Sequence, residues 1–204
     1  YHILHDYPDD ILSKWASYED RLNIGMDKIF KLLSDNNLKC TFFILGYIAR
    51  KHPNIIKKIH DQGHEIGAHS DMHNVAYRQT QEEFEEDLIS CIQSIEDIIG
   101  DKVISYRAPG FSVRKENVWV FEILNKLDIE YDASIFPALR EDGGFVSFNQ
   151  DGPAILNYKG CKIKEFPMSM NNFFGMRFTA TGGGYFRIFT YSIFYYFVKI
   201  YNYT

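Results

Sequence analysis

The chain has 204 residues, of which 46% are hydrophobic and 16% aromatic, so it can bury the core of one domain of somewhat more than average size. Its 22 basic and 27 acidic residues give a net charge of -5, and the lysines are spread along the chain rather than gathered into blocks. This pattern argues against nucleic acid as the main partner. The three cysteines form no CxxC pair, which favours three buried, reduced thiols over a disulfide framework or a cysteine-only zinc site.

The first third of the chain predicts helices that alternate with strands. Residues 39–45 (KCTFFIL) are typical of a strand, and residues 64–68 predict a second, shorter one. Between them, Pro53 favours the first turn of a helix, which Gly63 ends. A helix ahead of the first strand is predicted by apolar residues at helical spacing: Leu22, Met26, Ile29, Phe30 and Leu33.

The middle of the chain continues this alternation. Thr80 followed by Glu83 is the signature of a capping box, and the helix that it opens ends at Gly100. The elements predicted next are a strand over 103–106, a helix over 118–127 and a strand that begins over 129–131. Because strands and helices alternate as they do in βαβ units, we expect a parallel sheet or an α/β barrel.

The last part of the chain is less regular. Residues 137–157 predict a glycine-containing insertion over one face, and residues 161–167 (CKIKEFP) alternate as in a strand. The aromatic segment 185–203 would suit either a membrane surface or burial. We expect burial, or contact with residues beyond Thr204, because Arg187 and Lys199 are its only charges. No apolar run reaches the roughly 18 residues of a transmembrane segment. We expect one domain over residues 1–204, without internal repeats or a linker.

Residues 64–73 (HEIGAHSDMH) concentrate three histidines, a glutamate and an aspartate. His69 and His73 are four residues apart, at or just past the carboxyl end of a predicted strand, where active sites form in α/β sheets and barrels. Two imidazoles at this spacing can reach one divalent ion, although two solvated histidines would fit the spacing as well. We expect His64 to be structural, and Asp71 to be solvated or to support the histidines.

A second candidate motif is YRAPGFS, residues 106–112. Arg107 ends a predicted strand, and the following proline and glycine fix a turn. In such a turn Arg107 can hold a carboxylate through two hydrogen bonds, and the Gly110 N–H can face a ligand. A surface turn with an exposed arginine is the alternative for this motif taken alone.

Seven segments, taken together and in this order, resemble the polysaccharide deacetylase family. The resemblance is to carbohydrate esterase family four, the NodB-homology domain, and especially to its branch associated with bacterial exopolysaccharide loci. The segments are TFFILG (41–46), GHEIGAHSDMH (63–73), TQEEFEEDL (80–88), YRAPGFS (106–112), YDASIFP (131–137), EFPMS (165–169) and GGGYFR (182–187).

The resemblance implies a distorted (β/α) barrel of the NodB type, truncated here at both ends. It implies a hydrolase that removes N-acetyl groups from the amino sugars of a bacterial polysaccharide with a divalent metal, zinc first, with manganese or cobalt as alternatives. The partner would be an acetylated amino-sugar polysaccharide or oligosaccharide.

The same resemblance assigns roles to single residues. HSDMH matches the family's metal-binding motif with His69 and His73 as ligands and Ser70 between them. The arginine-proline motif falls on Arg107 and Pro109, so that Arg107 would orient the catalytic aspartate. The Gly110 N–H would help to stabilise the oxyanion, and Asp132 would flank the substrate groove as a substrate or supporting residue.

Two family motifs are not in the sequence. The acid pair that supplies the catalytic base and the third metal ligand is expected before Tyr1, and the histidine that acts as general acid is expected beyond Thr204. We therefore expect a part of a longer enzyme, in the cytoplasm or at the periphery of the cytoplasmic membrane. Two alternatives stay open: an inactive carbohydrate-binding domain of the same fold, and a metal-independent amide hydrolase similar to allantoinases.

Overall fold

A computed structural model gives the fold and describes residues 17–138, 143–150, 152–173, 176–179, 191, 192, 195, 196 and 199. Its centre is a six-stranded sheet in the order β1-β2-β3-β4-β6-β5, in which only β5 and β6 pair antiparallel. These strands are β1 (Thr41–Ile44), β2 (Glu65–Ala68), β3 (Ser105–Tyr106), β4 (Tyr131–Asp132), β5 (Ala154–Tyr158) and β6 (Cys161–Glu165). A separate antiparallel pair consists of β7 (Asn171–Phe173) and β8 (Met176–Phe178).

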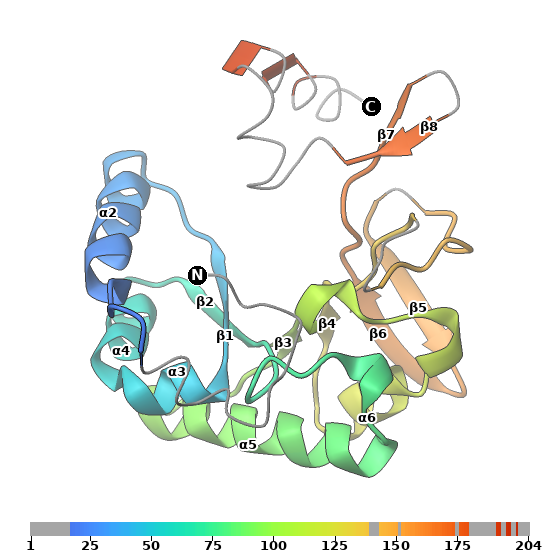
Figure 1. Cartoon of the computed structure of the whole chain (residues 1–204), viewed down its shortest axis with the longest axis horizontal. Helices are drawn as coiled ribbons and strands as arrows, with labels where there is room; N and C mark the ends of the chain where they lie inside the picture. The colour runs from blue at the N-terminus through green and yellow to red at the C-terminus, as the bar shows by residue number, and fades with distance from the viewer. Residues whose placement is uncertain are drawn as a thin grey trace.

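The helices follow the outer side of the sheet in an arc (Figure 1). They are α2 (Leu22–Asp35), α3 (Gly46–Lys51), α4 (Pro53–Asp61), α5 (Gln81–Ile99) and α6 (Val120–Lys126). Short 3₁₀ turns lie at η1 (Ala76–Arg78), η2 (Pro109–Phe111) and η3 (Lys115–Asn117). The predicted α/β fold with a parallel sheet is confirmed. Within the described residues the sheet is open, with β1 and β5 at its edges.

Helix α5 packs against one face of the sheet, and local sequence signals set both ends of this helix. The Thr80 hydroxyl accepts a hydrogen bond from the Glu83 N–H at 3.2 Å, and the Glu83 carboxylate accepts one from the Thr80 N–H at 2.8 Å. This is the predicted capping box. At the other end Gly100 adopts φ 74°, the left-handed conformation that glycine tolerates best. Phe84 packs edge-on against Tyr106 of β3, with ring centroids 5.9 Å apart.

The carboxyl ends of the parallel strands align at one rim of the sheet. Ala68, Tyr106, Asp132 and Glu165 are register partners in one row. Tyr106 faces α5, so this row points toward the helices, and the residue after each strand points to the opposite face. His69 and Arg107 are two of these following residues, which places both predicted motifs on the same rim and the same face.

Two elements differ from the sequence-based expectation. Residues 137–157 do not form only a loop, because β5 begins at Ala154 and pairs with β6. Helix α3 follows β1 at once and was not predicted. It begins at Gly46, where a Cβ atom would lie 2.0 Å from the Asp71 carboxylate, so only glycine lets this turn approach the histidine segment.

The aromatic segment 185–203 lies mostly outside the described residues. In the part that is described, Tyr191, Tyr195 and Tyr196 are 71%, 55% and 62% exposed, so these three side chains are not buried within this chain. Their contact with residues beyond Thr204 stays a prediction. None of the helices among the described residues is long and apolar enough to cross a membrane. Cys40, Cys91 and Cys161 are free thiols, as the sequence predicts, but the expectation that all three are buried is wrong, because Cys40 is exposed and Cys161 is only partly buried.

Candidate functional site

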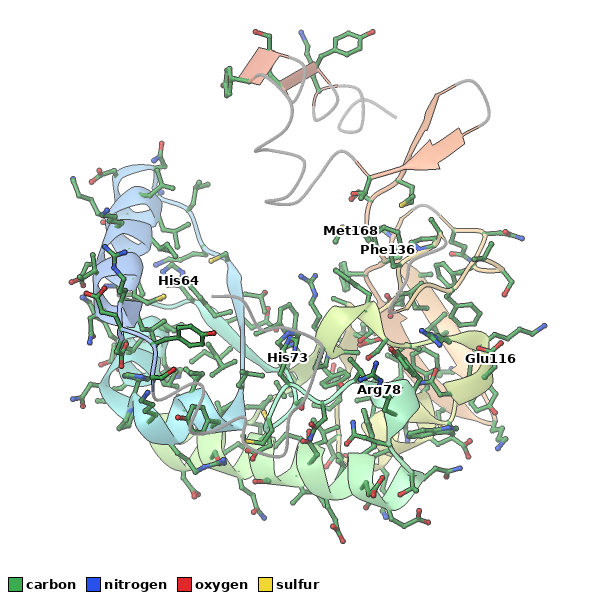
Figure 2. The ribbon with its side chains drawn as sticks, viewed as in Figure 1. His64, His73, Arg78, Glu116, Phe136 and Met168 are labelled. Carbon is green, nitrogen blue, oxygen red and sulfur yellow. The ribbon has the colours of Figure 1, made fainter. Side chains whose placement is uncertain are left out.

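The histidine segment turns sharply as it leaves β2. Ser70 and His73 adopt φ 71° and 66°, a left-handed conformation that costs a non-glycine residue roughly 1–3 kcal/mol. The two turns bring the imidazoles of His69 and His73 together edge to face, with ring centroids 5.2 Å apart. Strain of this kind persists only where the surrounding contacts enforce it, and it marks the segment as a candidate site. Figure 2 shows His73 near the ends of β2 and β3, far from His64.

His69 is held in the form that a metal ligand requires. Its Nδ1 atom lies 2.6 Å from the backbone carbonyl of Arg107. Because a carbonyl can only accept, Nδ1 must carry the hydrogen and Nε2 keeps its lone pair. Burial lowers the pKa of His69 to about 4, and the hydrogen bond to Arg107 opposes this shift without reversing it. The imidazole is therefore neutral at physiological pH.

His64, in contrast, takes a structural position. It is buried and stacks on Phe30 with an interplanar angle of 7°, and its ring also contacts Phe42 at a centroid distance of 5.4 Å. It lies near α2, on the helix side of the sheet and apart from His73 (Figure 2).

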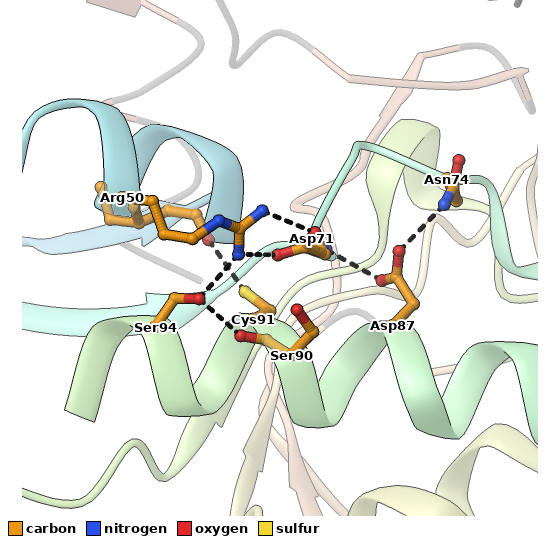
Figure 3. Close-up of polar contacts among 8 residues, drawn as sticks. Arg50, Asp71, Asn74, Asp87, Ser90, Cys91 and Ser94 are labelled. Atoms are coloured by element: carbon orange, nitrogen blue, oxygen red, sulfur yellow. Dashed lines mark hydrogen bonds and ion pairs between the residues drawn. The ribbon is translucent and has the colours of Figure 1, made fainter. Parts of the chain in front are cut away.

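Asp87 of α5 holds the turn between the two candidate ligands (Figure 3). One of its carboxylate oxygens accepts from the Asp71 N–H at 2.9 Å, and the other accepts from the Asn74 side-chain amide at 2.9 Å. Ser70 also hydrogen-bonds to Asp87, and the Ser70 hydroxyl accepts from the Asn74 N–H at 2.9 Å. One helical carboxylate thus fixes three residues of the segment 70–74.

Asp71 connects the same segment to α3. Its carboxylate forms a two-pronged ion pair with Arg50, at 2.6 and 2.8 Å, and Arg50 also donates to the Ser94 hydroxyl at 2.7 Å (Figure 3). The side chain of Asp71 is only 13% exposed, so it supports the segment rather than projecting into solvent. The N–H groups of Gly46 and Tyr47 complete the attachment by donating to the Ser70 and Asp71 carbonyls.

We expect Asp87→Asn to weaken divalent metal binding by about 10–100-fold, the usual effect of removing a group that orients a ligand. One carboxylate oxygen becomes an amide NH₂, which cannot accept from the Asp71 N–H or the Asn74 amide. Isothermal titration calorimetry with Zn²⁺ measures the change. Glu86→Gln, an exposed neighbour on α5, is the matched control. Unchanged affinity in a folded Asp87→Asn protein would contradict the role given to Asp87.

Arg107 lies against aromatic rings at the rim. Its Nε–H donates to the Ala133 carbonyl at 3.1 Å, and its guanidinium lies 4.6 Å from the Phe43 ring centroid and 5.6 Å from that of Phe111. Burial lowers the pKa of Arg107, while the nearby carboxyl groups of Asp132 and Glu165 raise it, and the guanidinium stays positive at any physiological pH. The structure therefore presents a fixed cation next to His69.

In the turn after Arg107, Gly110 adopts a backbone conformation that favours glycine. Pro109 is buried and opens η2, and Gly110 adopts φ 63°. Phe111 follows at φ 54°, and its carbonyl accepts from the Gly144 N–H at 3.3 Å. A Cβ atom on Gly143 would lie 2.2 Å from this carbonyl, so the 143–144 segment packs directly on the turn.

Three predicted supporting residues are buried. Ser70 is 2% and Asp132 is 1% exposed, and Pro109 is also buried. Asp132 accepts a hydrogen bond from the Ser134 hydroxyl, which in turn accepts from the Ala108 N–H at 2.8 Å. These positions favour support of Arg107 and the histidines over contact with a substrate. Within the described residues, no group of three histidine, cysteine or acidic side chains is placed to hold a metal.

Sequence reasoning missed Asp87 and Glu165. Glu165 is fully buried at the end of β6, in register with Asp132. The alternation in CKIKE places Glu165 on the same face as the buried Ile163, and this signal could have identified it. Asp87 offers no such signal, since it is one of several acidic residues in the first turns of α5.

Comparisons with known proteins identify the family. The family model for polysaccharide deacetylase matches residues 14–131, more than half of the chain, and a domain of unknown function, DUF3473, matches residues 133–204. The chain belongs to the polysaccharide deacetylase family. A peptidoglycan deacetylase of Helicobacter pylori is 30% identical over 130 residues, covering 64% of this chain and 42% of that protein.

Solved structures agree with this assignment. A candidate polysaccharide deacetylase from Mycobacterium smegmatis is 26% identical with a TM-score of 0.60, covering 71% of this chain and 46% of that one. A CE4 family pseudoenzyme from Bacillus anthracis is 25% identical with a TM-score of 0.50, covering 54% of this chain and 38% of that one. The chain spans less than half the length of these three relatives.

Proposed function

We propose that this chain carries part of the active site of a metal-dependent hydrolase that removes N-acetyl groups from the amino sugars of a bacterial polysaccharide. The observation that carries the proposal is the state and position of the His69 imidazole. In a chain of this family, a partly buried, neutral imidazole with its Nε2 lone pair available lies edge to face with His73 at the carboxyl rim of the sheet.

The donor set suits a borderline-soft divalent cation, zinc first, with manganese or cobalt as alternatives. His69 and His73 would hold the ion, and Asp87 and Asp71 would keep the segment between them in place. When bound, the ion would supply Lewis-acid chemistry at the acetamide carbonyl and lower the pKa of water.

The remaining roles fall on the turn after β3. Arg107 would orient a carboxylate base through its guanidinium, whose Nε–H is fixed on Ala133. The N–H of Gly110 would donate to the oxygen on which negative charge develops, an interaction worth about 3–4 kcal/mol for a well-placed donor. The partner would be an acetylated amino-sugar polymer, and we favour an exopolysaccharide on the sequence resemblance alone.

The test measures acetate release from N-acetylglucosamine oligomers by the whole protein that the encoding gene specifies. We expect release to stop when a chelator removes the metal and to return when Zn²⁺, Mn²⁺ or Co²⁺ is added back. Release that persists in excess chelator would instead support a metal-independent amide hydrolase. Glycan binding without release, in protein loaded with metal, would support a carbohydrate-binding domain.

A further inference from the structure

Two carboxyl groups meet in the core behind Arg107. Asp132 of β4 and Glu165 of β6 are register partners, and they are 1% and 0% exposed. One oxygen of each has an ordinary donor: the Ser134 hydroxyl donates to Asp132 Oδ1, and the Ile135 N–H donates to Glu165 Oε1 at 3.0 Å.

The second oxygen of each carboxyl has no such donor. Among the described residues, no N–H or O–H group donates to Asp132 Oδ2 or Glu165 Oε2, although the two side chains lie within hydrogen-bonding reach of each other. Two ionised carboxylates in this position would be acceptors only, and burying both charges would be very costly. A proton on one of the two removes a charge and supplies the missing donor.

The proton belongs on Glu165. Burial and then the charge of Asp132 raise the pKa of Glu165 well above its ordinary range, and Arg107 only partly opposes this. Burial also raises the pKa of Asp132, but hydrogen bonds from Glu165, Ser134 and Ala133 oppose that shift. Of the other titratable groups nearby, Tyr106 stays neutral because burial raises its pKa, and Arg107 stays charged.

We propose that Glu165 is a neutral carboxylic acid in the folded protein, that it donates a hydrogen bond to the Asp132 carboxylate, and that it acts as a positioning residue for Arg107. The contacts run through the segment 133–135. Glu165 accepts a hydrogen bond from the Ile135 N–H. Asp132 accepts one from the Ser134 hydroxyl, which in turn accepts one from the Ala108 N–H. The Ala133 carbonyl in the same segment accepts from Arg107. Only the role of Arg107 in this inference rests on the proposed function.

Denaturant unfolding from pH 5 to pH 9 tests the proton without any need for activity. A glutamic acid that is neutral when folded ionises on unfolding above its ordinary pKa of 4.5, so the contribution of Glu165 to wild-type stability falls as the pH rises. Glu165→Gln keeps a donor for Asp132 and an acceptor for Ile135 but cannot ionise. The ratio of folding constants, Glu165→Gln over wild type, should therefore rise with pH by up to about tenfold per unit.

Two further variants and one spectroscopic measurement complete the test. Glu116→Gln, an exposed glutamate labelled in Figure 2, should show a flat ratio. A flat ratio for Glu165→Gln as well would overturn the neutral acid. Glu165→Ala, which removes the donor, should shift the ¹⁵N–¹H resonance of Arg107 Nε and lower kcat by about tenfold, and Glu165→Gln should largely restore both. If Glu165→Ala and Glu165→Gln have the same Arg107 Nε resonance and the same kcat, Glu165 does not position Arg107.

A failure of the proposed function can be distinguished from a failure of the inference about Glu165. Wild-type protein that releases no acetate with metal present would contradict the deacetylase assignment. The pH dependence of stability and the Arg107 resonance would still decide whether Glu165 is neutral and whether it positions the guanidinium.

Discussion

Replacing His69 with alanine should abolish acetate release and reduce Zn²⁺ affinity by more than about 100-fold. Removing a group that only orients a ligand already costs about 10–100-fold, and this change removes a ligand itself. Calorimetry and metal analysis of the dialysed protein measure the affinity and the stoichiometry. His60→Ala is the matched control, since His60 pairs with Asp101 at 2.8 Å away from the candidate site.

The same substitution also has a structural cost that must be separated from the loss of metal. Without the imidazole, the Arg107 carbonyl loses its hydrogen-bond donor in a partly buried position, which costs about 1–3 kcal/mol. Circular dichroism and unfolding curves show whether His69→Ala still folds under assay conditions. A folded His69→Ala protein with full activity would refute the metal mechanism, and His73→Ala provides an independent repeat of the test.

Local signals in the sequence predict most of the fold. The capping box of Thr80 and Glu83 fixes the start of α5, and the left-handed Gly100 ends it, because both depend on residues close together in the chain. The strand before His69 is also local, and the parallel arrangement follows from the alternation of strands and helices. These features place His69 and Arg107 at one rim without any knowledge of tertiary contacts.

The parts that were missed depend on contacts between distant residues. Helix α3 has only six residues, too few for a helical periodicity to be recognised in the sequence. Its start depends on the close approach of Gly46 to Asp71. Asp87 acts on a segment more than ten residues before it, and Glu165 faces Asp132 only because β4 and β6 are neighbours. Sequence spacing identifies a ligand pair such as His69 and His73, but not the carboxylates that hold it in place.

Arg107→Ala should lower kcat by about 100-fold, with a smaller change in KM, because a reacting group misplaced by about 1 Å costs that much. The substitution removes the donor to the Ala133 carbonyl and the contact with the Phe43 ring. Under the proposed function it also leaves the carboxylate base without the guanidinium that would orient it. Arg107→Lys should recover only a small part, since lysine keeps the charge but not the planar pair of donors. Steady-state kinetics on an N-acetylglucosamine oligomer measure both variants.

Arg78→Ala is the control for this experiment, because Arg78 is exposed and contacts the Tyr77 ring. The comparison between lysine and alanine separates two explanations. If Arg107 served only as a positive charge, lysine would restore most of kcat. If it served only to pack against Phe43 and Phe111, both variants would lose stability in proportion to activity. A loss of kcat in both variants, with unfolding curves close to wild type, is the result that requires the two-pronged geometry of the guanidinium.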